Sequence, residues 1–193
     1  METNKLKGSS LAGKSATRER VDNDFYVTPE NAIESILKLE KLEGNIWECA
    51  CGDGAISKVL DKHYPTNEIF STDIIDRGYG KGGIDFLKTE IKVDNIITNP
   101  PFNLAKEFIE RAISSARKKV IMFAKIQLLE SADRKALFDK YPAKTIYVFS
   151  KRINPLRNGN PTNENGKKWA STMCFAWFVW EIGYKGKMTI EII

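Results

Sequence analysis

The sequence is poor in the residue types that build metal sites and disulfide frameworks. Its 193 residues include one histidine, His63, and three cysteines, Cys49, Cys51 and Cys174. These four residues could bind one zinc ion only if all of them converged, and their spacing fits no zinc finger or ribbon. An odd number of cysteines is a poor basis for a secreted disulfide framework. We therefore expect reduced thiols in a cytoplasmic protein, and no metal site.

The sequence also lacks long apolar runs. No stretch approaches the roughly 18 apolar residues of a transmembrane helix, and the polar N-terminus has no apolar signal region. We therefore expect neither a membrane span nor a signal peptide, and no membrane partner. The 30 Lys and Arg residues outnumber the 25 Asp and Glu residues, so the net charge is +5. A modest positive charge suits a polyanionic partner without proving one.

The chain divides into an arm and one domain. Residues 1–22 contain few large apolar side chains and cannot compensate the entropy lost on ordering, which predicts a flexible basic N-terminal arm. The remaining residues, 23–193, contain the alternating apolar runs of a folded domain, and their number suits a single hydrophobic core.

Predicted helices and strands alternate along this domain. Thr28 is the predicted N-cap of the first helix, with Pro29 in its first turn. A third helix is expected to end at the basic run 117–119, where the helix dipole favours cations. The alternation indicates an α/β fold with a mostly parallel sheet and helices on both faces. Strands are predicted at 46–50, 68–73, 95–98, 120–124, 145–149 and 174–180.

One long connection, 151–171, contains no predicted helix or strand. Loops of this length in a compact domain are usually functional or disordered. We interpret its basic residues as candidate contacts to nucleic-acid phosphates, and the alternative is a solvated connection. These residues are Arg152, Arg157, Lys167 and Lys168.

The run Asn99-Pro100-Pro101-Phe102 follows a predicted strand, at the edge of the sheet where ligands bind. The two prolines fix two φ angles and remove two N–H donors, which leaves a stiff turn. The Asn99 side-chain oxygen and the Pro100 carbonyl could each accept one N–H of an exocyclic amino group, and Phe102 could stack on the ring. The alternative is the start of a helix with Asn103 as its N-cap.

This run resembles the fourth motif of the S-adenosylmethionine-dependent amino-methyltransferases, which methylate adenine N6, cytosine N4 or a glutamine amide. The family's glycine turn has a counterpart at residues 48–54, and its acid for the ribose hydroxyls has one in Asp73. Its acid–apolar pair for the adenine of the cofactor resembles Asp85-Phe86. Its N-terminal motif resembles residues 25–29, and the likeness covers roughly 24–181.

The resemblance implies a Rossmann-like, seven-stranded methyltransferase sheet that binds S-adenosylmethionine. It implies catalytic roles for Asn99, Pro100, Pro101 and Phe102. The cofactor-binding residues implied are Tyr26, Thr28, Pro29, Glu48, Ala50, Cys51, Gly52, Gly54, Asp73, Ile74, Asp85, Phe86 and Asn99.

The chain looks most like small phage-encoded, adenine-specific DNA methyltransferases, which implies DNA as partner and the cytoplasm of a bacterial or phage-infected cell. Related proteins with this motif order usually carry a target-recognition domain after the catalytic core. Here we expect a single methyltransferase domain without a separate one. Sequence specificity is then expected to come from the 151–171 loop, from the arm or from a partner, or to be slight.

Three other functions fit parts of the same pattern. An RNA adenine methyltransferase and a protein glutamine-amide methyltransferase share the core motifs, and a non-catalytic relic could bind nucleic acid through them. A dinucleotide-binding oxidoreductase fits poorly, because Ser57 stands where that fingerprint has Gly or Ala.

Overall fold

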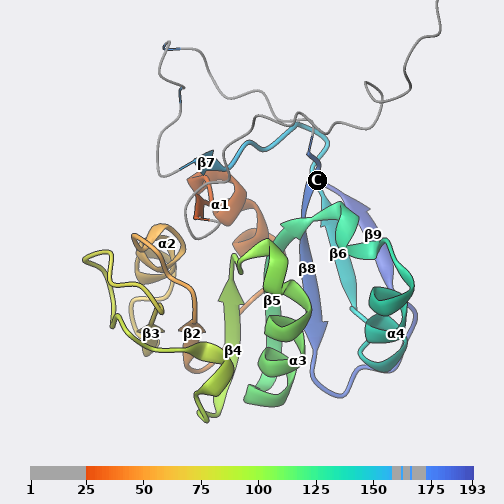
Figure 1. Ribbon diagram of the computed structural model, residues 1–193, viewed down its shortest axis with the longest axis horizontal. Coiled ribbons are helices and arrows are strands. Elements are labelled where there is room, and N and C mark those ends of the chain that lie inside the picture. Colours follow the sequence, from red (N-terminus) through yellow and green to blue (C-terminus); the bar gives the residue numbers. More distant parts are fainter. Residues whose placement is uncertain (1–24, 158–161, 163–165, 167–172) are drawn as a thin grey trace, which may run out of the picture.

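The computed structural model describes residues 25–157, 162, 166 and 173–193, so the predicted arm 1–22 lies outside the described residues. The described chain forms a seven-stranded sheet in the order β3-β2-β4-β5-β8-β6-β9, with helices on both faces (Figure 1). The strands are β2 (Ile46–Glu48), β3 (Ile69–Ser71), β4 (Val93–Thr98), β5 (Ala116–Lys125), β6 (Thr145–Val148), β8 (Phe175–Glu181) and β9 (Thr189–Ile192).

The sheet is mostly parallel, as the sequence predicted. Strands β2, β3, β4 and β5 pair in parallel, β6 pairs in parallel with β9, and β8 runs antiparallel to both β5 and β6. The first six residues of β8 are all buried, which agrees with their uninterrupted apolar sequence. The carboxyl ends of β2, β4 and β5 therefore meet at one edge of the sheet, where the ligands of such folds bind.

Two pairs of helices cover the two faces. Helices α1 (Glu30–Leu39) and α2 (Ala55–His63) contribute to one apolar cluster, and α3 (Ala105–Ser115) and α4 (Ala132–Lys140) contribute to the other. This arrangement confirms the α/β fold: α1, α2 and α3 each bury several residues against the sheet, and α4 buries Leu137.

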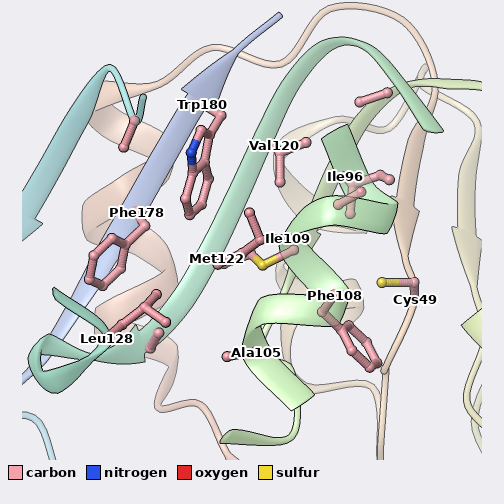
Figure 2. Packing of buried hydrophobic residues seen from close by; sticks show 14 of the residues in the cluster. Cys49, Ile96, Ala105, Phe108, Ile109, Val120, Met122, Leu128, Phe178 and Trp180 are labelled. Carbon is pink, nitrogen blue, oxygen red and sulfur yellow. The ribbon is translucent and has the colours of Figure 1, made fainter. Parts of the chain in front are cut away.

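Strand β5 contributes side chains to both apolar clusters. Val120 and Met122 pack on the face that carries α3, while Ile121 and Phe123 pack on the face that carries α1. Figure 2 shows Val120 and Met122 beside Ile109 of α3. These four β5 side chains and Ile109 are fully buried. Successive residues of β5 therefore pack alternately on the two faces of the sheet, as the geometry of a strand requires.

The end of one helix, one strand and one helix cap differ from the prediction. Helix α3 ends at Ser115, and the basic residues 117–119 lie in β5, because Ala116 already has an extended backbone and pairs with Val93 of β4. Strand β9 was missed, because all four of its residues are exposed and give no burial pattern. Thr28 is not an N-cap: Pro29 holds that position in α1, with an extended backbone and no side-chain cap.

Two short strands pair outside the main sheet. Strand β1 (Tyr26–Val27) pairs antiparallel with β7 (Leu156–Arg157), with Tyr26 opposite Arg157. The prediction that 151–171 contains no strand is therefore wrong at β7. The pair lies above α1 in Figure 1 and brings the start of this loop to the N-terminal motif.

The described part of the chain contains no helix that is both long and apolar enough to cross a membrane. Within the same residues, no three His, Cys, Asp or Glu side chains gather in a way that could hold a metal ion. Cys49 and Cys51 are buried free thiols and Cys174 is an exposed one.

Candidate functional site

A cavity of about 780 Å³ opens at the carboxyl ends of β2, β4 and β5, within the size range of small-molecule sites. Its walls come from the segments that follow these strands and from β1. Of the predicted site residues, Tyr26, Ala50, Asp73, Ile74, Asp85, Phe86, Asn99, Pro101 and Phe102 line it. Thr28, Pro29, Glu48, Cys51, Gly52, Gly54 and Pro100 lie outside that lining.

The glycine turn after β2 requires glycine at two positions. Gly52 and Gly54 have φ angles of 57° and 84°, in the left-handed region that favours glycine. A Cβ on Gly52 would lie 2.4 Å from the Phe25 ring, and one on Gly54 would lie 2.5 Å from the Tyr79 ring. The turn is therefore packed against two aromatic rings, and its two glycines lie next to the cavity without lining it.

Asp73 links this turn to the segment after β3. Its Oδ2 accepts the Gly52 N–H at 2.8 Å, and its Oδ1 accepts the Ile75 N–H at 2.8 Å. Arg77 also contacts Oδ1 at 3.3 Å and lies 4.3 Å from the Phe25 ring. The carboxylate is buried, so these contacts fix its orientation at the cavity wall.

The next acid–apolar pair lies on the same side of the cavity. Asp85 caps the short 3₁₀-helix η2 (Phe86–Lys88) by accepting the Leu87 N–H at 3.1 Å. Phe86 is buried against Trp47 and Phe108, with ring centroids 5.1 and 4.9 Å away. The Asp85 carboxylate therefore lies next to Phe86, whose ring packs on aromatic residues of the core.

Glu48, at the end of β2, is almost fully buried behind the turn. Its Oε1 accepts the Ala50 N–H at 3.3 Å, whereas its Oε2 has no hydrogen-bond partner within the described chain. Burial raises the pKa of this carboxyl from 4.5 to about 8, and the Thr98 hydroxyl and the Ala50 N–H oppose the shift only in part. Glu48 is therefore mostly protonated near neutral pH.

Asn99 belongs to another wall of the cavity, directly after β4. Its Nδ2 donates to the Tyr26 carbonyl at 2.7 Å and to the Thr28 hydroxyl at 3.0 Å. With both N–H groups used inside the protein, the side-chain oxygen is the hydrogen-bonding atom left for a partner in the cavity.

The segment leads into a helix, but the N-cap predicted for it is wrong. The 3₁₀-helix η3 (Phe102–Leu104) follows Pro101 and leads into α3. Leu104, not Asn103, is the N-cap of α3, and no side chain caps it. Asn103 is instead an exposed residue of the cavity lining.

Phe102 belongs to an aromatic group at the cavity wall. Its ring centroid lies 5.3 Å from Tyr26 and 5.7 Å from Phe175. The Lys125 ammonium lies 4.2 Å from the ring centroid, in a cation–π contact. An aromatic ligand that stacks on this covered face of Phe102 would have to displace the Lys125 side chain.

Sequence reasoning missed three polar residues of the wall that follows β5. Lys125 ends that strand, Gln127 lies in the 3₁₀-helix η4 (Ile126–Leu129), and Arg134 lies in α4. The Gln127 Oε1 is buried and has no hydrogen-bond partner within the described residues. Lys125 and Gln127 directly follow a predicted parallel strand, so the rule for ligand sites at strand ends could have found them.

The structure describes the predicted phosphate-binding residues only in part. Arg152 is exposed, and the backbone of Arg157 pairs with the cavity residue Tyr26. Lys167 and Lys168 lie outside the described residues.

Comparison with known proteins supports the fold. No protein-family model and no curated protein sequence matches the chain. Among solved structures it is similar to a modification subunit of a proposed type I restriction enzyme from Vibrio vulnificus (TM-score 0.61, 12% identity), covering 85% of this chain and 45% of that one.

Two smaller proteins give similar matches. A proposed RNA methyltransferase from Pyrococcus horikoshii has a TM-score of 0.60 at 15% identity, covering 86% of this chain and 91% of that one. A magnesium protoporphyrin IX methyltransferase from Synechocystis, solved with bound S-adenosylmethionine, has a TM-score of 0.55 at 13% identity, covering 80% and 79%. The fold of this chain is therefore the Rossmann-like fold of these methyltransferases.

Proposed function

We propose that the chain is an S-adenosylmethionine-dependent methyltransferase that modifies the exocyclic amino group of a nucleobase, with N6 of adenine in DNA as the first candidate. The main observation behind the proposal is that two hydrogen bonds fix the side-chain amide of Asn99. Both of its N–H groups are bound by the N-terminal motif, and the residue lines the cavity beside Phe102. An amide fixed in this way offers an acceptor to an amino group.

The wall that contains Asp73 fits the proposed cofactor. Ile74 is apolar yet 62% exposed, and it lines the same cavity as Asp73 and Asp85. An apolar face flanked by carboxylates suits a nucleoside, whose ring needs a flat contact and whose hydroxyl and amino groups need acceptors. Asp73 and Asp85 would hold these polar groups, and Ile74 would contact the ring.

When bound, S-adenosylmethionine supplies an electrophilic methyl group carried on a sulfonium sulfur. The task of the chain is then to align the target amino nitrogen. Oδ1 of Asn99, a residue of the cavity lining, accepts one N–H of the amino group and so draws the nitrogen lone pair out of conjugation with the ring; the Pro100 carbonyl, expected from the sequence to accept the other, lies outside the cavity lining. The aligned nitrogen would accept this methyl group in place of one proton, which would pass to solvent.

A base inside a duplex cannot reach such a cavity, so the target must be flipped out or single-stranded. Phe102 offers the stacking surface, and stacking displaces Lys125 from the ring. The Lys125 ammonium and the exposed Arg152 then suit phosphates beside the flipped base.

The test combines the purified chain with labelled S-adenosylmethionine and, separately, DNA, RNA and protein. We expect label in DNA, recovered as N6-methyladenine after nucleoside analysis. Label in N4-methylcytosine would show that cytosine, not adenine, is the target base, and label only in RNA or protein would overturn the DNA assignment. Cofactor binding without methyl transfer to any of the three would support the alternative of a non-catalytic protein that binds nucleic acid.

A further inference from the structure

Residues 25–28 contact both walls of the cavity. The Phe25 ring lies over Gly52 of the glycine turn, and the Tyr26 ring lies 5.3 Å from Phe102. The Tyr26 carbonyl and the Thr28 hydroxyl accept the two N–H groups of Asn99. Both of these hydrogen bonds come from one side chain, that of Asn99.

An asparagine side chain has two orientations of similar steric fit, because its terminal torsion is roughly two-fold. Only one of them presents the oxygen to a ligand in the cavity. In the other, the oxygen would face the Tyr26 carbonyl, which cannot donate, and the N–H groups would be turned toward the amino group of the substrate. The Tyr26 carbonyl can only accept and therefore selects the orientation with Nδ2 toward it, while the Thr28 hydroxyl adds a second hydrogen bond that holds the amide there.

Thr28 is placed for this task and for no other that the described residues show. It is buried and does not line the cavity, and Pro29 takes the N-cap position for which the sequence suggested Thr28. Strand β1 is itself held by β7, where Val27 pairs with Leu156. Thr28 directly follows this paired strand, and its hydroxyl lies 3.0 Å from Asn99 Nδ2.

We propose that Thr28 is a positioning residue for methyl transfer: its hydroxyl holds the Asn99 amide so that Oδ1 faces the target amino group. The proposal rests on the proposed function, and it replaces the direct cofactor contact that the resemblance implied for Thr28. The Tyr26 carbonyl shares the task, but a backbone group cannot be removed by substitution, so Thr28 gives the test.

The experiment compares Thr28→Val, which loses the hydroxyl at nearly constant shape, with Thr28→Ser, which keeps it. We expect Thr28→Val to lower kcat about tenfold, the size expected for one lost neutral hydrogen bond, with cofactor Kd within about twofold of wild type. Thr28→Ser should restore most of kcat. Thr145→Val removes a buried threonine hydroxyl on β6, away from the cavity, and should leave kcat unchanged.

A second measurement does not depend on catalysis. The side-chain ¹⁵N–¹H₂ signals of Asn99, assigned by their loss in Asn99→Ala, should shift in Thr28→Val and stay close to wild type in Thr28→Ser and Thr145→Val. If no amino group is methylated by the wild type, the proposed function fails while these signals still decide whether Thr28 holds Asn99. Unchanged Asn99 signals, or a kcat of Thr28→Val equal to wild type, would overturn the proposal.

Discussion

The two walls of the cavity differ in how far along the chain their contacts reach. The Asp73 carboxylate is bound by Gly52, 21 positions away, and by Ile75 and Arg77, which are closer still. The Asn99 amide is bound by Tyr26 and Thr28, which are 73 and 71 positions away. The hydrogen bonds of Asp73 thus stay within the β2–α2–β3 unit and the segment that follows it, whereas those of Asn99 need residues from the start of the described chain.

The largest expected effect is a loss of methyl transfer without a loss of cofactor affinity, which would show that the two walls have separate roles. Asn99→Ala removes the acceptor proposed for the amino group, so methyl transfer should fall by roughly 10²–10³-fold, as for other groups that act only in the transition state. Cofactor affinity, measured by calorimetry, should remain within a few-fold of wild type, because the Asp73 wall is intact.

A matched control is Asn95→Ala, which removes a buried asparagine at the other end of β4, where its amide binds the Glu43 carbonyl. This variant should lose stability but keep kcat. Equal loss of cofactor affinity and turnover in Asn99→Ala would contradict the separate roles of the walls.

Asp73→Ala should show the reverse pattern. Its loss leaves the Gly52 N–H without an acceptor, which costs about 1–3 kcal/mol of folding stability, and weakens cofactor binding about tenfold or more. Asp94→Ala is the control, since Asp94 also accepts a backbone N–H, from Asn45, at the far edge of the sheet. Urea denaturation and cofactor titration measure both effects, and an unchanged cofactor affinity would refute the assignment.

Glu48→Gln tests the buried acid behind the Asp73 wall. The folded pKa of about 8 lies above the unfolded value of 4.5, so between them the folded state keeps a proton that the unfolded state has lost. Stability should therefore fall as pH rises through this window, by up to about 1.4 kcal/mol per pH unit.

Glutamine cannot ionise, so this slope should be absent in Glu48→Gln. Urea denaturation across the window measures it, with the exposed Glu43→Gln as control, which should retain the wild-type slope. Equal slopes for wild type and Glu48→Gln would show that Glu48 is ionised in the folded protein.

The smallest effect concerns nucleic acid. Arg157→Ala should weaken DNA binding a few-fold and reduce the slope of log K against log salt by about one, as for one lost phosphate contact. Arg117→Ala removes the same charge from the amino end of β5, at the opposite edge of the sheet, and should leave the slope unchanged. Fluorescence anisotropy at several salt concentrations distinguishes them, and identical slopes would argue against a phosphate at Arg157.

Patterns within short segments predicted much of this molecule. The apolar runs of β4, β5 and β8 and the stripe of α1 gave the α/β fold, because burial leaves a periodic signature in the sequence. Features without that signature were missed. The exposed strand β9 is one, and the β1–β7 pair is another, since each of its strands has only two residues and its partners lie far apart in the sequence.

The cavity wall after β5 was missed for a related reason. Lys125 and Gln127 follow a predicted strand, but no local motif marks them, and Arg134 reaches the cavity from a helix. A polar side chain becomes part of a site through its neighbours in space, and those neighbours come from other strands.

The sequence by itself determined the alternation of strands and helices and the order of the motifs. It also placed these motifs at the ends of strands, because glycine, proline and apolar periodicity act over a few residues. The tertiary structure decided what each residue touches. It placed the Thr28 hydroxyl on Asn99 instead of at the helix N-terminus, buried Glu48 until its pKa rose to about 8, and brought β7 beside β1. Hydrogen bonds and desolvation depend on distances that only the folded chain sets.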